Sequence, residues 1–163
     1  MKSIETTVCE LLIERGMKLS TAESCTGGLI AQKITSVPGA SECFDVGVVT
    51  YSNEQKHKIL GVLEETLLKF GAVSQATALE MCRGVKNLAD ADFGISVTGI
   101  AGPGGGTPEK PVGTVWIGIC SDNLHKAEKF NFDGDRQKVR ESTANIALKM
   151  VKDAILNIKN RES

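Results

Sequence analysis

The sequence predicts an α/β protein, a three-layer α/β/α sandwich built around a mixed sheet of about five strands. Short β-branched runs alternate with longer segments whose apolar residues recur at helical spacing, which is typical of a sheet covered by helices. The strand-like runs at 112–119 and 126–132 are joined by the polar turn 121–123, which predicts a hairpin and one antiparallel neighbour in the sheet. The 163 residues have the length of one compact domain, which we expect to span 1–163.

Periodicity and turn residues place the individual elements. Helices are expected over residues 3–15, 25–35, 53–60, 64–70, 75–88 and 136–158. Strands are expected over residues 17–22, 44–51, 93–98, 112–119 and 126–132, the second of them as a buried strand. Gly16 is expected to end the first helix, and Ser74 to begin the fifth. The last helix is expected to bury one stripe of side chains, Val139, Thr143, Ile146, Met150, Ala154 and Ile158.

Composition argues against several classes of protein. The net charge is −1 and 4% of residues are aromatic, so we expect no nucleic-acid partner. No apolar run approaches the roughly 20 residues that span a bilayer, so no membrane association is expected. The five cysteines include no Cys-x-x-Cys pair, which favours reduced thiols and a cytoplasmic protein. The two histidines have no further ligands at zinc spacing, and no metal site is expected.

Residues 21–28, with the sequence TAESCTGG, form the stretch most suggestive of chemistry. A hydroxyl-rich, glycine-bearing turn between a strand and a helix exposes a side-chain oxygen and directs free backbone N–H groups at a ligand. Ser24 is therefore a candidate nucleophile, with the backbone of Cys25, Thr26, Gly27 and Gly28 as the oxyanion-binding group. The alternatives are that Ser24 or Thr26 only caps the helix, and that Cys25 is either a rival nucleophile or a small core residue.

Lys56 is the candidate base for Ser24, because neither histidine is well placed for a Ser-His-acid triad. It lies about one turn into a helix, where the helix dipole disfavours a cation, and burial against Tyr51 and the sheet would lower its pKa further. A lysine needs such a lowered pKa to act as a base near neutral pH. The alternative is an ordinary solvated lysine.

Two further features are candidates for substrate binding. The glycine-rich loop at 99–106 can bring backbone N–H groups close to an anion or a ring, although it matches neither a P-loop nor a dinucleotide fingerprint. Arg136 and Arg140, four residues apart at the start of the last helix, can hold a phosphate. The alternatives are a long mobile loop and surface pairing of the arginines with nearby acidic residues.

Several ordered blocks together resemble one known family. They are TAESCTGG at 21–28, VVTYSNEQK at 48–56, GAVS at 71–74, SVTGIAGPGGGTPEKPVGTVWIG at 96–118 and FDGDRQKVR at 132–140. These blocks strongly resemble the nicotinamide-nucleotide amidase family, also known as the C-terminal domain of the competence-damage protein CinA. The similarity extends over nearly the whole chain, and the chain is similar to the stand-alone form of that family.

The resemblance implies hydrolysis of nicotinamide mononucleotide to nicotinic acid mononucleotide and ammonia, a step of pyridine nucleotide salvage that needs neither a metal nor an organic cofactor. The family serine matches Ser24 and the family lysine matches Lys56. Further motif positions near the substrate match Tyr51, Thr98 and Arg140, with the ring expected beside the glycine loop at Gly99 and Gly102 and the phosphate on Arg140, Arg136 or Lys110. The resemblance also implies a homodimer.

Two other functions stay open from the sequence. The same loops in a non-catalytic or regulatory domain would bind a pyridine nucleotide without turning it over. A Ser-Lys pair on this scaffold would also serve an amidase or esterase that acts on another substrate.

Overall fold

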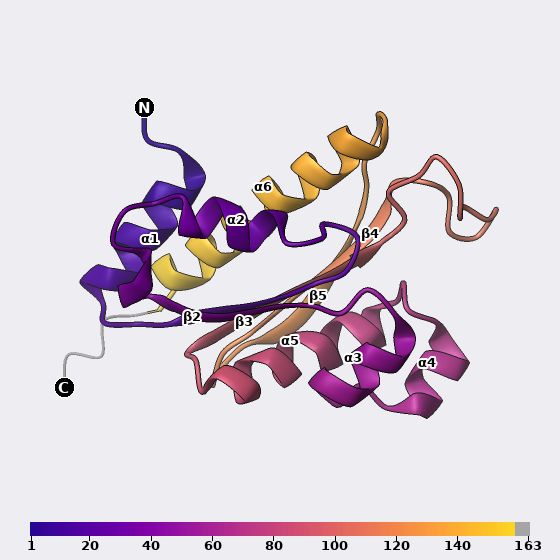
Figure 1. The fold of residues 1–163 in the computed structure, drawn as a ribbon, viewed down its shortest axis with the longest axis horizontal. Coiled ribbons are helices and arrows are strands. Elements are labelled where there is room, and N and C mark those ends of the chain that lie inside the picture. The colour runs from indigo at the N-terminus through magenta and orange to yellow at the C-terminus, as the bar shows by residue number, and fades with distance from the viewer. Residues whose placement is uncertain (159–163) are drawn as a thin grey trace.

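The structure, a computed structural model, describes residues 1–158, and it is a three-layer α/β/α sandwich as the sequence predicts (Figure 1). Its five strands have the order β2-β1-β3-β4-β5. β1 pairs in parallel with both β2 and β3, whereas β3–β4 and β4–β5 are antiparallel. The sheet is therefore mixed, and the hairpin predicted at 112–132 supplies its antiparallel half.

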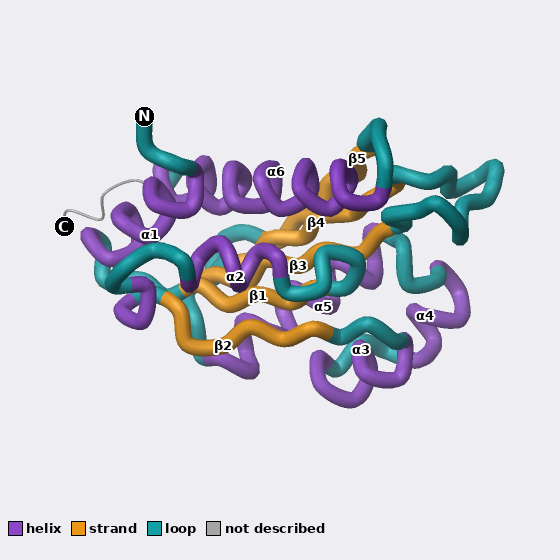
Figure 2. The backbone as a smooth tube through the Cα atoms, turned by 45° about the horizontal axis from the view of Figure 1, so that its top comes forward, coloured by secondary structure: helices purple, strands orange, loops and turns teal. Residues whose placement is uncertain are grey.

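The strands are β1 (Leu19–Glu23), β2 (Phe44–Val49), β3 (Phe93–Gly99), β4 (Thr114–Cys120) and β5 (His125–Asn131). The α-helices are α1 (Ile4–Glu14), α2 (Leu29–Thr35), α3 (Asn53–Leu60), α4 (Glu64–Phe70), α5 (Gln75–Ala89) and α6 (Arg136–Leu156), and a short 3-10 helix spans Ala40–Glu42. Helices α1, α2 and α6 cover one face of the sheet, and α3, α4 and α5 lie on the other (Figures 1 and 2).

Side-chain caps begin most of these helices, as the polar residues before them predict. The hydroxyl of Ser52 accepts from the Gln55 N–H at the start of α3, and Ser74 does the same for the Thr77 N–H at the start of α5. The carboxylate of Asp135 accepts from the Lys138 N–H at the start of α6. Such caps satisfy amide groups that the first turn of a helix leaves without an intrahelical partner.

The apolar core consists of two clusters, one on each face of the sheet. The larger lies under α1, α2 and α6 and includes Leu12, Ile95 and Leu148. The smaller, under α3 and α5, includes Ala22, Leu60 and Met81. Because β1 is fully buried between the two helical layers, the turn that follows it is held from both sides.

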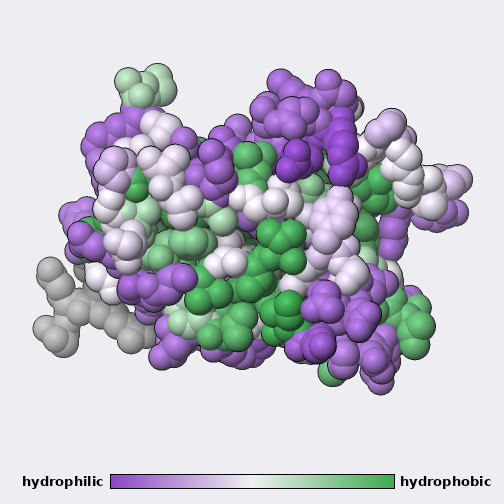
Figure 3. Space-filling view, in the orientation of Figure 1, coloured by the Kyte–Doolittle hydropathy of each residue, from purple (hydrophilic) through white to green (hydrophobic). Residues whose placement is uncertain are grey.

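Two expectations about individual elements are wrong in detail. The second helix begins at Leu29, because residues 24–28 form a turn. β2 is an edge strand with alternating half-buried and exposed residues. Figure 3 shows a hydrophobic patch, in green, where this edge of the sheet faces the viewer. Apolar side chains of β2 contribute to the patch.

The buried stripe of α6 also differs from the expected one. Val139 and Thr143 are buried, but Ile146, Met150, Ala154 and Ile158 are only partly buried at the edge of the core. The fully buried positions further along the helix are Ala144, Ala147, Leu148, Val151 and Ile155. Small residues at 144 and 147 let the helix lie close to the sheet, so the buried face is set by packing as well as by hydrophobicity.

Candidate active site

The candidate site lies where the carboxyl ends of β1, β2 and β3 meet, which is where open α/β sheets usually place ligands. Ser24 directly follows β1, and Thr50 follows β2. The Ser24 N–H donates to the Val97 carbonyl of β3 at 3.1 Å, and the Thr50 N–H donates to the Glu23 carbonyl of β1 at 2.9 Å. These bonds continue the sheet by one residue past β1 and β2. The loop after β1 and the loop after β2 therefore begin side by side at the same edge of the sheet.

Ser24 and Lys56 are in direct contact. The Lys56 Nζ lies 3.0 Å from the Ser24 Oγ and 2.8 Å from the Thr50 carbonyl oxygen. The lysine is 1% exposed and the serine 9%, so the contact is almost dry while the serine stays reachable. The structure therefore brings together the two residues that the sequence proposes as nucleophile and base.

Burial lowers the pKa of Lys56 from 10.5 to about 8, because the charged amine loses its hydration inside the protein. No carboxylate pairs with this amine; its two acceptors within the described residues are a hydroxyl and a carbonyl. The expected burial against Tyr51 is wrong, since that side chain is 59% exposed. A lysine with this pKa is partly neutral near neutral pH and can accept a proton from Ser24.

The turn after Ser24 has a conformation that depends on glycine. Gly27 and Gly28 have φ angles of 60° and 101°, in the left-handed region that residues with side chains rarely adopt. The Gly27 N–H already donates to the Ser24 carbonyl at 3.0 Å. Among the described residues no acceptor is recorded for the N–H groups of Cys25, Thr26 and Gly28, so these three amides are the available donors in the turn.

A buried carboxylate fixes this turn, and the sequence analysis did not identify it. Glu23, 1% exposed, accepts from the Ile30 N–H at 2.8 Å, the Ala31 N–H at 3.1 Å and the Thr26 hydroxyl at 2.6 Å. It therefore caps α2 from five residues before the N-cap, which is Gly28. The alternative in which Ser24 or Thr26 caps the helix is wrong; an acidic residue just ahead of the turn was the available signal.

Arg140 holds the same turn from the side of α6. Its Nε lies 3.2 Å from the Cys25 carbonyl oxygen and its Nη2 lies 2.9 Å from the Thr26 carbonyl oxygen. A carbonyl fixed in this way also fixes the plane of its peptide, and with it the direction of the following N–H. Arg140 was predicted to bind phosphate; here its guanidinium supports the backbone of the turn.

Replacing Glu23 by glutamine tests the role of this carboxylate. An amide offers one acceptor oxygen and places an NH₂ against the other donors, so at least one buried N–H loses its partner. We expect a loss of about 2–3 kcal/mol in the free energy of unfolding, measured by urea denaturation. Glu10→Gln on the exposed face of α1 is the control, with an expected change within about 0.5 kcal/mol. A Glu23→Gln protein as stable as the wild type would contradict the assignment.

Cys25 is a core residue. It is 5% exposed, and burial raises the pKa of its thiol to about 11, more than the neighbouring backbone lowers it. A neutral thiol is a poor nucleophile. Of the alternatives for this residue, the small core residue is the one that the structure favours.

Tyr51, Arg136 and the glycine loop meet beside the turn. Arg136 donates from Nη2 to the Tyr51 hydroxyl and from Nη1 to the Gly102 carbonyl, both at 2.8 Å. Both Tyr51 and Arg136 are exposed to solvent. Three segments that are far apart in the sequence thus form one polar rim, which Tyr51 joins to Thr50 and so to the Lys56 side of the site.

Three further residues that were predicted to lie near the substrate, Thr98, Gly99 and Lys110, contact other parts of the fold. The Thr98 hydroxyl is buried and donates to the Ala72 carbonyl at 2.8 Å, which joins β3 to the segment before α5. A side chain at Gly99 would meet the Val115 Cγ2 atom 2.6 Å from its Cβ. The Lys110 Nζ donates to the Phe70 carbonyl at 2.9 Å, at the end of α4.

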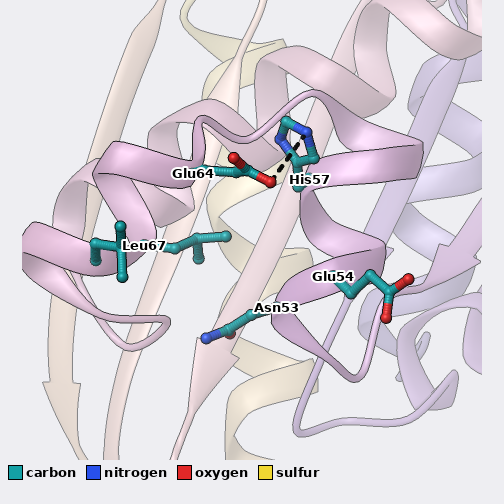
Figure 4. A pocket seen from close by; sticks show the side chains of 6 residues that line it. Asn53, Glu54, His57, Glu64 and Leu67 are labelled. Carbon is teal, nitrogen blue, oxygen red and sulfur yellow. Dashed lines mark ion pairs between the residues drawn. The ribbon is translucent and has the colours of Figure 1, made fainter.

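A separate hollow of about 320 Å³ lies between α3 and α4, on the outer side of α3 (Figure 4). It is lined by Asn53, Glu54, His57, Glu64, Leu67 and Leu68. His57 and Glu64 face one another across it at 3.8 Å. Neither Ser24 nor Lys56 lines this hollow, so its position does not bear on their chemistry.

Within residues 1–158, no three histidine, cysteine, aspartate or glutamate side chains gather in a way that would hold a metal ion. Over the same residues, no helix is both long and apolar enough to cross a membrane.

Fold and site together define an α/β domain with a buried serine-lysine pair at the carboxyl edge of its sheet. A family model described as the CinA C-terminal domain matches residues 1–155, and the chain belongs to this family. A CinA-like protein from Kosmotoga olearia is 52% identical over 155 residues, and a relative from Clostridium perfringens is 56% identical over 141 residues. These matches cover 95% and 86% of the chain.

Solved structures show the same fold. A CinA superfamily protein from Klebsiella pneumoniae has a TM-score of 0.91 at 37% identity, covering 94% of this chain and 96% of that one. A competence/damage inducible protein from Agrobacterium tumefaciens has a TM-score of 0.85 at 41% identity, covering 96% and 98%. By contrast, the chain spans only 34% and 38% of the length of the curated relatives from Clostridium and Kosmotoga.

Proposed function

We propose that this domain hydrolyses the carboxamide of nicotinamide mononucleotide, releasing ammonia and nicotinic acid mononucleotide, through a Ser24–Lys56 dyad. The observation that carries the proposal is the 3.0 Å contact between the Ser24 hydroxyl and a buried amine whose pKa is about 8. The choice of substrate rests on the resemblance of the motif blocks to the nicotinamide-nucleotide amidase family.

In the first half of the reaction, neutral Lys56 accepts the proton of Ser24 while the Ser24 oxygen attacks the carboxamide carbon. The Thr50 carbonyl, 2.8 Å from the lysine Nζ, orients the amine toward the serine. Free N–H groups of Cys25, Thr26 or Gly28 stabilise the oxyanion of the tetrahedral intermediate, each donor contributing about 3 kcal/mol by analogy with other acyl-transfer sites.

In the second half, protonated Lys56 gives its proton to the departing amine, and ammonia leaves the acyl-enzyme. Lys56, neutral again, activates a water molecule that attacks the ester carbon. Collapse of the second intermediate breaks the bond to the Ser24 oxygen, which takes back the proton from Lys56, and the released carboxylic acid loses its own proton to water. Every proton moves between groups that this chain and water supply.

We place the phosphate of the nucleotide at the polar rim formed by Arg136, Tyr51 and the glycine loop. Arg136 is exposed, and its hydrogen bond to the Tyr51 hydroxyl can be exchanged for bonds to phosphate oxygens. Arg140, already bonded to two carbonyls, keeps the oxyanion turn in position.

The test is ammonia release by the purified protein from nicotinamide mononucleotide and from a panel of other carboxamides, namely nicotinamide, nicotinamide riboside and simple aliphatic amides. We expect release only where the substrate carries the 5′-phosphate. A protein that binds the mononucleotide without releasing ammonia would instead be a nucleotide-binding module. Faster ammonia release from another amide would be compatible with the Ser24–Lys56 dyad but would contradict nicotinamide mononucleotide as the substrate.

The rate is also expected to depend on the protonation of Lys56. Below a pH of about 8 the amine is mostly charged and cannot accept the serine proton, so kcat/KM should fall about tenfold per pH unit as the pH decreases. Above that pH the rate should level off. A pH profile of kcat/KM between pH 5.5 and 9.5 checks this, and a rate that is flat from pH 6 to 8 would contradict Lys56 as the base.

A further inference from the structure

Two buried hydroxyl groups have no hydrogen-bond partner within residues 1–158. They belong to Thr21 in β1 and to Thr50 just after β2, and both residues are 0% exposed. Other buried hydroxyls, such as those of Ser20 and Ser96, donate to a carbonyl. A buried hydroxyl without a partner is unfavourable, because it has given up its hydrogen bonds to water. What lies beside each of the two hydroxyls differs.

Thr21 lies on the face of the sheet that is turned away from Lys56. A Cβ at Gly47 would lie 2.6 Å from the Thr21 Oγ1 and 3.3 Å from the Cβ of Ala31 in α2. The Thr21 hydroxyl is therefore on the face covered by α2, whereas Lys56 belongs to α3 on the other face (Figures 1 and 2). Thr21 thus provides a comparison, a buried hydroxyl of the same kind away from the dyad.

Thr50, by contrast, lies beside the dyad. Glu23 is the register partner of Val49, and the Thr50 N–H continues this ladder by donating to the Glu23 carbonyl at 2.9 Å. Ser24 and Thr50 are therefore the next neighbours along the β1–β2 pair, one strand spacing of about 4.8 Å apart and with side chains on the same face. The Thr50 carbonyl also accepts from the Lys56 Nζ at 2.8 Å. The hydroxyl without a partner belongs to the residue that already binds the lysine amine.

The Lys56 amine, in turn, has more donors than recorded acceptors. A charged lysine amine carries three N–H donors. Within the described residues it has two acceptors, the Ser24 Oγ at 3.0 Å and the Thr50 carbonyl at 2.8 Å. Because Lys56 is 1% exposed, water does not readily supply the third. The charged amine lacks one acceptor where the neighbouring residue has one unused hydroxyl oxygen.

We propose that the Thr50 hydroxyl is the third hydrogen-bond acceptor of the Lys56 ammonium group and stabilises the charged lysine that forms when the Ser24 proton is taken up. This bond is absent from the structure as described, and it forms when the third N–H of the charged amine turns toward the hydroxyl. It gains importance when the Ser24 oxygen bonds to the substrate carbon and becomes a weaker acceptor. Thr50 is then a positioning residue that acts through Lys56. Its part in turnover rests on the proposed amidase reaction, whereas its effect on the amine exists in the free protein.

The other groups around Lys56 do not supply this acceptor. The charge of Cys25 acts on the amine and raises its pKa, against the larger effect of burial. Glu54 and His57, on the same helix, line the outer hollow between α3 and α4 (Figure 4). From α5, the smaller core cluster presents apolar side chains such as Met81. Within residues 1–158 none of these side chains is hydrogen-bonded to the amine, and none of the ion pairs includes it.

The first test is the pKa of Lys56 in the folded full-length chain, measured by NMR titration of ¹³C-labelled lysine side chains, with Lys56→Met to assign the signal. Thr50→Val replaces the hydroxyl by a methyl group of similar size. We expect it to lower the pKa of Lys56 by about one pH unit, because the charged form loses an acceptor. Thr50→Ser keeps the hydroxyl and should restore the wild-type pKa.

Thr21→Val is the matched control, since it removes the other buried hydroxyl without a partner, and it should leave the pKa of Lys56 unchanged. An unchanged pKa in Thr50→Val, or an equal fall in Thr21→Val, would overturn the proposal. Thr50→Ala, which also lacks the hydroxyl, gives the same reading if Thr50→Val does not fold.

Kinetics with nicotinamide mononucleotide test the role in turnover. We expect Thr50→Val to lower kcat about tenfold with KM changed by less than about twofold, and the fall of kcat/KM toward acidic pH to begin about one pH unit lower. Thr50→Ser should recover both. A Thr50→Val protein with the kcat and pH profile of the wild type would contradict the role in turnover. If the wild type releases no ammonia, the amidase proposal fails, and the NMR titration still decides whether Thr50 stabilises the charged lysine.

Discussion

Replacing Ser24 by alanine is expected to reduce ammonia release from nicotinamide mononucleotide by at least about 10⁴-fold, because within residues 1–158 Ser24 has the only hydroxyl or thiol that is hydrogen-bonded to the Lys56 amine. The neighbouring Cys25 cannot take over, since burial raises the pKa of its thiol to about 11. The substitution removes one oxygen from a side chain that is 9% exposed, so the fold should persist. Steady-state kinetics together with calorimetric titration of the nucleotide will separate lost chemistry from lost binding.

The matched control is Ser20→Ala. Ser20 lies on β1, the strand that leads into Ser24; it is fully buried and donates its hydroxyl to the Phe93 carbonyl at 3.0 Å, away from Lys56. This variant is expected to lose about 1 kcal/mol of stability and to keep its kcat. A Ser24→Ala protein with wild-type kcat would rule out the acyl-enzyme, and equal losses in both variants would point to a general effect on folding.

Replacing Lys56 by methionine is expected to remove activity to a similar extent and, unusually for a buried substitution, to leave the protein at least as stable at pH 7. A pKa lowered from 10.5 to about 8 means that the charged lysine costs the folded state about 3 kcal/mol. The variant removes this cost. It loses the hydrogen bond to the Thr50 carbonyl, which offsets about 1–3 kcal/mol of the gain.

The pH dependence distinguishes this explanation from a simple packing effect. Between pH 8 and 10.5 the unfolded chain keeps the Lys56 proton while the folded protein has lost it, so the stability of the wild type rises with pH through this window. Below pH 8 both states are protonated and the full cost is present. The advantage of Lys56→Met should therefore shrink by about 2–3 kcal/mol between pH 7 and pH 10.

Denaturation of wild type and variant in urea at the two pH values checks this, and the comparison cancels the titration of all other groups. Lys58→Met, on the exposed side of the same helix, is the control and should show no such pH-dependent difference. A constant difference between Lys56→Met and wild type at both pH values would contradict a lowered pKa for Lys56.

The sequence predicts the fold well because most of its information is local. The hairpin at 112–132, Gly16 at the end of α1 and the cap at Ser74 depend on a few neighbouring residues, and all are confirmed. The predictions of burial are wrong where burial depends on residues that are distant in the sequence. An apolar run such as 44–49 fits the centre of a sheet or its edge equally well, and only the strand order placed it at the edge.

For the candidate site, the motif blocks identify Ser24 and Lys56, and the proposed amidase activity and the homodimer stay predictions. Their 3.0 Å contact depends on β1 and β2 being neighbours, which residue types alone do not specify. The roles of Glu23 and Arg140 were also decided by tertiary structure. A charged side chain binds whatever donor or acceptor the fold places beside it, and beside these two the fold places backbone groups of residues 25–31.

The sequence by itself determined the layered α/β fold, the strand-turn-helix around Ser24 and the residue types needed for a dyad, because periodicity, glycines and capping residues act over a few positions. Only the tertiary structure decided that Lys56 is buried and that Glu23 and Arg140 hold the turn after Ser24. Burial and contact between distant segments change pKa values and hydrogen-bond partners, and these depend on the packing of the whole chain.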